Sequence, residues 1–202
     1  MIAIVDYGVG NLFSLVSSLN KIGAESGVTS DKEVIEGCEK IILPGVGAFI
    51  DAREKLRACG LDKVVTNEAK RGKKILGICL GMQLLFEDSY EHGKSYGLGI
   101  LKGSVVPISD EVSSEYKIPH IGWNKLSIKK QSPIFKYIND GDYVYFVHSF
   151  YVKGCEDSLL ATTDYGAELT ASVALNNVYG CQFHPEKSGE VGLKILKGFM
   201  DL

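Results

Sequence analysis

The stretch from Lys73 to Phe86 constrains the fold of this chain more than any other part of the sequence. A short apolar run leads into the pentapeptide GICLG at Gly77 to Gly81, and an apolar pattern with helical spacing follows. This order predicts a strand, a sharp turn and a helix, with Cys79 at the turn. Glycines two residues before and two residues after the cysteine would let the two arms of the turn approach closely.

A cysteine at such a turn is placed for nucleophilic chemistry. The pattern of a nucleophile between two glycines marks the reactive residue of many hydrolases, which more often carry serine. The helix after the turn would direct backbone N–H groups and the positive end of its dipole at the sulfur, which favours the thiolate. A small buried cysteine on an ordinary strand-to-helix connection is the alternative, and the two glycines argue against it.

Apolar runs and helical patterns alternate through the first half of the chain. We expect buried strands at residues 2–5 and 40–43, and helices at 12–22, 49–58 and 61–69. Strands that alternate with helices in this way form a parallel sheet covered on both faces. The sequence therefore predicts an α/β fold, doubly wound around a mostly parallel central sheet.

From residue 97 onward, strand-like stretches dominate the sequence. They cover residues 98–108, 125–128, 143–151, 159–163, 170–175 and 178–183, and a helical pattern follows at 189–202. This half is expected to add mixed or antiparallel strands to the sheet or beside it. Because the 202 residues show no internal repeat and no linker, we expect one domain covering residues 1–202.

Composition argues against several classes of protein. The formal net charge is −3 and basic residues form only pairs, which gives no support to binding of nucleic acid or of an anionic membrane. No apolar run approaches the ~20 residues of a membrane helix, and residues 1–9 do not resemble a signal peptide. A cytoplasmic protein is therefore expected.

Neither a metal nor an organic cofactor is expected. The five cysteines are irregularly spaced and contain no CxxC pair, which argues against a structural zinc site or a disulfide framework. Gly8 and Gly10 begin a pattern found in dinucleotide-binding folds, but Phe13 stands where a third glycine or alanine is required.

A cysteine nucleophile needs a base, and His184 is the best placed of the four histidines. It follows the apolar stretch 178–183 and precedes Pro185 and Glu186. Proline forces the preceding residue into an extended conformation, in which residues i and i+2 point to the same side. Glu186 can then hold one ring nitrogen while the other faces Cys79, as in triads of nucleophile, base and orienting acid. The alternative is a strand-end histidine beside a solvated glutamate.

The other histidines receive no catalytic role. His92 lies in a polar loop and is expected to be exposed. His148 is expected to be a core residue of a strand, on the same face as Val144 and Phe146. The sequence leaves the role of His120 open.

The chemistry of such a triad also requires donors for a negatively charged oxygen. The backbone N–H of Leu80, directly after the nucleophile, is one expected donor. Val46 is expected to provide the other, because Gly45 and Gly47 flank it in a turn after the strand at 40–43. A tight turn without this role is the alternative.

Together these residues resemble the triad-type, or class I, glutamine amidotransferases. Residues 77–83 and 184–186 carry the motifs of the family as a whole, and the resemblance runs from residue 4 to about residue 188. Residues 6–11, 44–49, 119–124 and 145–150 resemble one branch, whose members supply ammonia to a cyclase in histidine biosynthesis. No catalytic position departs from the family pattern.

The resemblance implies a reaction and a set of site residues. Cys79 would attack the side-chain amide of glutamine to form a thioester and release ammonia, while His184 moves protons and Glu186 holds its ring. The backbone N–H groups of Val46 and Leu80 would bind the oxyanions. Residues implied to bind glutamine are Gly45, Gly47, Gln83, Ser149 and Phe150.

The resemblance also implies a partner. Ammonia would pass directly to a (β/α)₈ cyclase subunit in a heterodimer, which would make imidazole glycerol phosphate and the purine precursor AICAR. Four residues match family positions at or near the partner face: Asn11, Trp123, Tyr145 and Lys187.

Three other functions stay open at the level of sequence. A paralogous subunit would deliver ammonia to a different acceptor, such as a sugar amidination enzyme, and nothing in the catalytic motifs excludes it. A free-standing cysteine hydrolase would be fully active alone, whereas the glutaminase subunit is expected to be weakly active until its partner binds. A scaffold protein with a relic triad is disfavoured, because Cys79, His184 and Glu186 are all intact.

Overall fold

The first strand is buried on both faces, which explains its continuous apolar sequence. In the computed structural model, which describes residues 1–202, β1 spans Ile2–Val5 and all four residues are buried. Ala3 and Val5 pack into one hydrophobic cluster, whereas Ile2 and Ile4 pack into a second one. A strand with a hydrophobic layer on each side needs helices on both faces of its sheet.

The central sheet has eight strands in the order β2-β1-β3-β4-β14-β13-β12-β9. The strands from β2 to β14 in this order are parallel, and β13, β12 and β9 continue the sheet in antiparallel pairing. Their bounds are β1 (Ile2–Val5), β2 (Ser26–Thr29), β3 (Lys40–Leu43), β4 (Lys74–Ile78), β9 (Ser127–Ile128), β12 (Leu159–Asp164), β13 (Glu168–Leu175) and β14 (Val178–Cys181). The predicted α/β fold, with a mostly parallel sheet and antiparallel strands in the C-terminal half, is confirmed.

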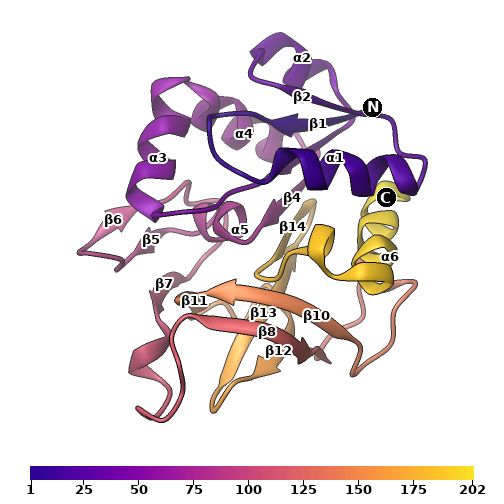
Figure 1. Ribbon diagram of the computed structural model, residues 1–202. Helices are drawn as coiled ribbons and strands as arrows, with labels where there is room; N and C mark the ends of the chain where they lie inside the picture. The colour runs from indigo at the N-terminus through magenta and orange to yellow at the C-terminus, as the bar shows by residue number, and fades with distance from the viewer.

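Helices pack on both faces of this sheet, with more helices on one face than on the other (Figure 1). The helices α2 to α5 contribute to one hydrophobic cluster, and α1 and α6 contribute to the other. Their bounds are α1 (Leu12–Lys21), α2 (Lys32–Gly37), α3 (Phe49–Ala58), α4 (Leu61–Lys70), α5 (Leu80–Leu84) and α6 (Gly189–Met200). None of the helices has both the length and the apolar character that crossing a membrane requires.

Two smaller sheets flank the central one. An antiparallel pair joins β8 (His120–Lys125) to β10 (Tyr143–His148), and a second sheet has the order β11-β7-β5-β6. The strands of the second sheet are β5 (Asp88–Ser89), β6 (Ser95–Tyr96), β7 (Ser104–Pro107) and β11 (Phe150–Lys153). Short 3₁₀ helices span Ile108–Asp110, Pro133–Phe135 and Pro185–Lys187.

The expected elements agree closely with the structure in the first half of the chain. The expected strands at 2–5 and 40–43 and the expected helix at 49–58 have the observed bounds, and the helices expected at 12–22 and 61–69 differ by one residue at one end. The sequence did not predict β2, α2, β5, β6 or β8. Their short or polar stretches carry little periodic signal.

The second half differs most from expectation in three places, and the strand expected at 178–183 and the helix expected at 189–202 each end two residues early. Only residues 104–107 of the expected strand at 98–108 are a strand, because the backbone N–H groups of residues 98–101 bond to carbonyls of Leu84, Leu85 and Phe86 at the end of α5. The expected strand at 125–128 is interrupted at Leu126. The expected strand at 143–151 breaks at Ser149, and its halves β10 and β11 enter different sheets.

The order of the central strands brings three loops together. The strands β3, β4 and β14 are parallel neighbours, so their carboxyl ends lie at one edge of the sheet. The residues that follow them are the glycine turn at 44–47, Cys79, and the segment 182–186. The carboxyl edge of an open α/β sheet is where such folds commonly bind ligands.

Candidate active site

Cys79 occupies a strained turn between β4 and α5. Its φ of 53° and ψ of −113° are rarely adopted by a residue with a side chain. A Cβ atom on Gly77 would lie 2.7 Å from the Cα of Met82, and one on Gly81 would overlap the carbonyl oxygen of Leu43. Close backbone contacts on both sides of the cysteine therefore require the two glycines.

The sulfur of Cys79 lies in a buried setting with few polar neighbours. The backbone N–H of Cys79 donates to the carbonyl of Cys181 in β14 at 2.7 Å. The Nε2 atom of Gln182 lies 3.7 Å from Sγ, and the carbonyl oxygen of Val147 lies 4.0 Å from it. The helix α5 has only five residues, so its dipole is smaller than the sequence led us to expect.

His184 follows β14 and holds the extended conformation that Pro185 imposes, with φ of −99° and ψ of 99°. Its Nδ1 atom lies 2.7 Å from Oε1 of Glu186, and both side chains are buried. The backbone N–H of His184 donates to the carbonyl of Tyr145 at 2.9 Å, and the Ser188 hydroxyl donates to the His184 carbonyl at 2.6 Å. The two backbone hydrogen bonds fix the main chain of His184, and the contact with Glu186 fixes the orientation of its ring.

The charge state of His184 follows from its neighbours. Burial lowers the pKa of the ring, but hydrogen bonds and charges from Cys79 and Glu186 outweigh burial and raise the pKa to about 10. The second carboxylate oxygen of Glu186 is buried and has no hydrogen-bond partner, so His184 is the only partner of this carboxylate. The protonated form of the ring is therefore favoured at neutral pH, between the sulfur of Cys79 and the carboxylate of Glu186.

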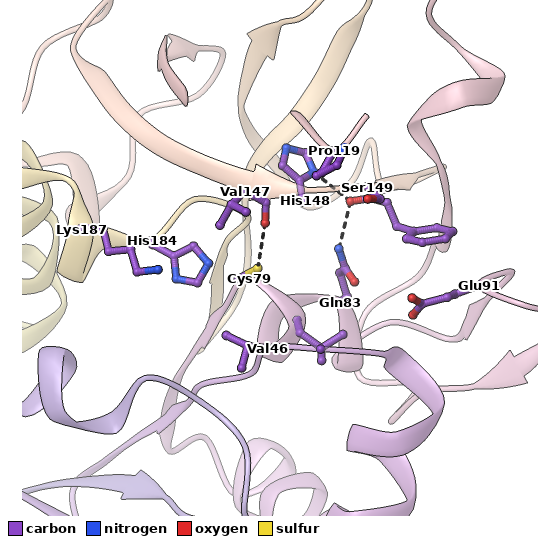
Figure 2. Close-up of a pocket in the computed structure, with 13 residues that line it drawn as sticks. Val46, Cys79, Gln83, Glu91, Pro119, Val147, His148, Ser149, His184 and Lys187 are labelled. Carbon is purple, nitrogen blue, oxygen red and sulfur yellow. Dashed lines mark hydrogen bonds between the residues drawn. The ribbon is translucent and has the colours of Figure 1, made fainter. Parts of the chain in front are cut away.

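The side chains of Cys79 and His184 face each other across one end of a cavity of about 390 Å³ (Figure 2). Nine of the predicted site residues line this cavity: Val46, Gly47, Cys79, Leu80, Gln83, Ser149, Phe150, His184 and Lys187. Glu186 lies behind the ring of His184, as an orienting carboxylate should. Gly45 does not line the cavity. It packs against the turn that carries Cys79 (residues 77–81), which we call the nucleophile elbow. A Cβ atom on Gly45 would lie 2.8 Å from the backbone nitrogen of Gly81.

The cavity also has lining residues that the sequence did not single out: Glu91, Pro119, Val147 and His148. Glu91 carries the only carboxylate of the lining, and its Oε2 accepts from the backbone N–H of Phe49 at 2.6 Å. Glu91 lies in a polar loop without periodic pattern, so no signal in the sequence alone pointed to it.

The two histidines of β8 and β10 form a buried pair. Nδ1 of His120 lies 3.0 Å from Nε2 of His148, whose Nδ1 donates to the carbonyl of Phe150 at 2.9 Å. Burial lowers the pKa of His120, and it lowers the pKa of His148 to about 3. The prediction that His148 is a hydrogen-bonded core residue is confirmed.

Comparison with known proteins agrees with this geometry. The sequence model described as glutamine amidotransferase class-I matches residues 3–201. A protein of Caldanaerobacter subterraneus subsp. tengcongensis named imidazole glycerol phosphate synthase subunit HisH is 53% identical, over 100% of this chain and 98% of its own length. The chain belongs to the HisH branch of the class-I glutamine amidotransferases.

Other HisH proteins and solved structures extend this relationship. The HisH subunit of Oceanobacillus iheyensis is 51% identical over 100% of this chain and 99% of its own. A structure described as a glutamine amidotransferase superposes with a TM-score of 0.77 at 19% identity, covering 100% of this chain and 98% of the other. The PurLQS structure from Thermotoga maritima gives a TM-score of 0.76 at 23% identity, covering 99% and 97%. These two likenesses concern the fold alone.

The residues that the HisH resemblance assigns to a partner face fall into two places. Trp123, 52% exposed, meets Tyr145 edge to face with ring centroids 6.0 Å apart, and Nζ of Lys187 lies 5.9 Å from the Tyr145 ring centre. This surface cluster borders the cavity through Lys187. Asn11 instead lies beside a small cavity of about 10 Å³, which His184 also lines.

Proposed function

We propose that this chain is the glutaminase subunit of an imidazole glycerol phosphate synthase. It hydrolyses glutamine to glutamate and ammonia, and it delivers the ammonia to a cyclase subunit that makes imidazole glycerol phosphate and AICAR in histidine biosynthesis. The observation that supports this most strongly is the meeting of Cys79 and His184 at one cavity, with Glu186 2.7 Å from the far ring nitrogen. The 53% identity to a HisH subunit over the whole chain supports the same function.

The reaction begins with attack of the Cys79 sulfur on the side-chain amide carbon of glutamine. The raised pKa of His184 keeps a proton on the ring beside the sulfur, and the sulfur then reacts as thiolate. As the C–N bond breaks, His184 gives this proton to the departing nitrogen. Ammonia and a thioester on Cys79 are the products of this step.

Hydrolysis of the thioester completes the cycle. His184, now neutral, takes a proton from a water molecule whose oxygen attacks the thioester carbon. The second tetrahedral intermediate expels the Cys79 sulfur as thiolate, glutamate leaves, and the ring of His184 is again protonated. Glu186 stabilises the charged ring throughout.

Both tetrahedral intermediates carry a negatively charged oxygen that needs donors. We assign this role to the backbone N–H groups of Leu80 and Val46, both of which line the cavity. Gly45 and Gly47 flank Val46 and allow its peptide to turn. Loss of one such donor typically lowers the rate by about 10²–10³-fold.

Glutamine needs partners for its α-amino and α-carboxylate groups as well as for its amide. Glu91 is the only carboxylate in the lining, so it is the proposed partner of the α-ammonium group. Gln83 and Ser149 lie on the same side of the cavity as Glu91 (Figure 2). Together with Phe150, which also lines the cavity, they contact the body of the substrate.

The cyclase partner docks on the surface cluster of Trp123, Tyr145 and Lys187. The cluster is next to the cavity and includes one exposed aromatic side chain. Tryptophan and tyrosine side chains are enriched where partners make their strongest contacts. Asn11, beside the small cavity that His184 also lines, is a second, separate part of the proposed interface.

The test is to combine the chain with the cyclase subunit of a HisH-dependent synthase and to supply glutamine. We expect cyclisation that depends on glutamine, and only weak glutaminase activity from the chain alone. Cys79→Ala should abolish glutamine use, while partner binding and cyclisation with added ammonium persist. If ammonium cannot support cyclisation in the variant complex, the separation of roles is wrong. If the cyclase stays inactive but another ammonia acceptor is aminated, the paralogous function is correct.

A further inference from the structure

We infer that Gln182 is a positioning residue that links Cys79 to Gln83 through a single buried amide. This inference rests on the proposed glutaminase function of the site. Gln182 directly follows β14, has no exposed surface, and does not line the cavity. Its backbone N–H donates to the carbonyl of Ala171 at 2.9 Å, so its side chain is not needed for pairing of the strands.

The direction of each hydrogen bond in this chain of amides is fixed by a backbone carbonyl. The carbonyl of Phe150 can only accept, so the Gln83 atom 3.0 Å from it is the donor Nε2. The same Nε2 lies 2.9 Å from Oε1 of Gln182 and donates its second hydrogen there. The amide nitrogen of Gln182 must then point the other way, where it lies 3.7 Å from Sγ of Cys79.

This arrangement decides what Gln83 presents to the substrate. Both hydrogens of its amide are used inside the protein, and its remaining polar atom, Oε1, can only accept. Figure 2 shows this oxygen on the side of Gln83 where Glu91 lies. An acceptor beside a carboxylate suits an ammonium group, which for glutamine is the α-ammonium. If the Gln83 amide were reversed, its oxygen would face the Phe150 carbonyl oxygen at 3.0 Å, which is repulsive. The hydrogen bond from Gln83 to Oε1 of Gln182 further stabilises the observed orientation.

The same amide acts on the nucleophile. An N–H group that points at the sulfur stabilises the thiolate more than the neutral thiol. At 3.7 Å the contact is long, so its effect is smaller than that of the charged His184 ring. Gln182 thus favours the reactive form of Cys79 and the substrate-binding orientation of Gln83 at the same time.

The variant Gln182→Met tests both effects, because methionine has a similar length and no hydrogen-bonding amide. We expect the rate of alkylation of Cys79 by iodoacetamide at neutral pH to fall about fivefold, because the sulfur loses the N–H group that favours its reactive form. Alkylation is followed on the Cys79 peptide by mass spectrometry, because Cys59 is exposed as well. In the complex with the cyclase, the KM for glutamine should rise about 5- to 10-fold.

A second variant separates the two effects. If Gln182 acts on substrate binding through Gln83, adding Gln182→Met to Gln83→Met should raise KM no further. The shift in Cys79 alkylation should persist in the double variant, since the contact with the sulfur does not involve Gln83. Additive effects on KM would contradict the positioning role.

Ser172→Ala is the matched control. Its hydroxyl is fully buried and donates to the Gly180 carbonyl at 2.8 Å, two residues before Gln182, but it does not line the cavity. The control should lower the melting temperature and leave alkylation and KM unchanged. Equal shifts in Ser172→Ala, or no shift in Gln182→Met within an active complex, would overturn this inference alone. A wild-type complex that does not hydrolyse glutamine would overturn the proposed function.

Discussion

Replacement of Glu186 by glutamine tests the electrostatics of the site without a change of shape. Oε1 of Glu186 lies 2.7 Å from Nδ1 of His184, and the two side chains are only 4% and 3% exposed. Glutamine has the same size and can still accept the hydrogen bond through its oxygen. Because it carries no charge, Glu186→Gln removes the ion pair and keeps the geometry.

The size of the effect follows from the separation and the burial of the two groups. Unit charges about 4 Å apart interact by about 4 kcal/mol at an effective dielectric constant of 20, and 1.36 kcal/mol corresponds to one pKa unit. Loss of the Glu186 charge is thus expected to lower the pKa of His184 from about 10 toward its ordinary value, while the contact with Cys79 still raises it. Since the charged ring stabilises the attacking thiolate, kcat/KM for glutamine should fall by about 10²–10³-fold. Glutaminase assays in the complex with the cyclase measure this.

The same pair makes stability depend on pH, and the sign is fixed by the direction of the shift. The folded pKa of His184 lies above its unfolded value of ~6.5. Its contribution to the free energy of unfolding is therefore complete below about pH 6.5 and is lost as pH rises toward 10. Urea unfolding should show a stability advantage of wild type over Glu186→Gln that shrinks across this range. A variant with kcat/KM within threefold of wild type and a parallel pH dependence of unfolding would refute this reasoning.

Three further predictions concern positions around the site and in the core. Gly45→Ala should reduce the free energy of unfolding by about 1–3 kcal/mol in urea titrations and should lower glutaminase activity. The reason is that the new Cβ atom would lie 2.8 Å from the backbone nitrogen of Gly81. Unchanged stability would mean that the turn at 44–47 can move to make room. Burial raises the pKa of the Glu68 carboxyl, but hydrogen bonds and charges from Lys73 and Arg71 outweigh it and hold the pKa below its usual value. This stabilisation is present above the unfolded pKa of ~4.3 and is lost as pH falls through the folded pKa, so Glu68→Gln should give a flatter acid unfolding curve than wild type; equal curves would contradict it. Glu91→Gln should raise the KM for glutamine about 10- to 100-fold with a smaller change in kcat, measured by steady-state kinetics, and an unchanged KM would remove Glu91 from the substrate site.

The arrangement of Cys79, His184 and Glu186 could be predicted because each part has a local cause. Gly77 fixes the elbow by close backbone contact, and Pro185 extends the residue before it. The rule that parallel strands share a carboxyl edge then brings these local geometries together. The distances between these groups and the charge of the ring depend on packing between distant segments, which the sequence does not show.

The features that the sequence did not reveal depend on distant contacts. Glu91 is held by the backbone of Phe49, 42 residues away, and Gln182 bonds to a side chain 99 residues away. The apolar residues 98–101 suit a strand locally, but they bond to the end of α5 instead. The sequence around Ser149 is apolar and gives no sign that the strand ends there. The break exists because β10 and β11 belong to two different sheets.

The pairing of β4 with β14 has a consequence for the protein during its synthesis on the ribosome. The backbone of Cys79 is hydrogen-bonded to β14, which His184 follows, yet 104 residues lie between Cys79 and His184 in the chain. During translation the thiol leaves the ribosome long before its base has been synthesised. A polypeptide that ends before His184 therefore has the nucleophile but lacks the base that glutamine hydrolysis requires.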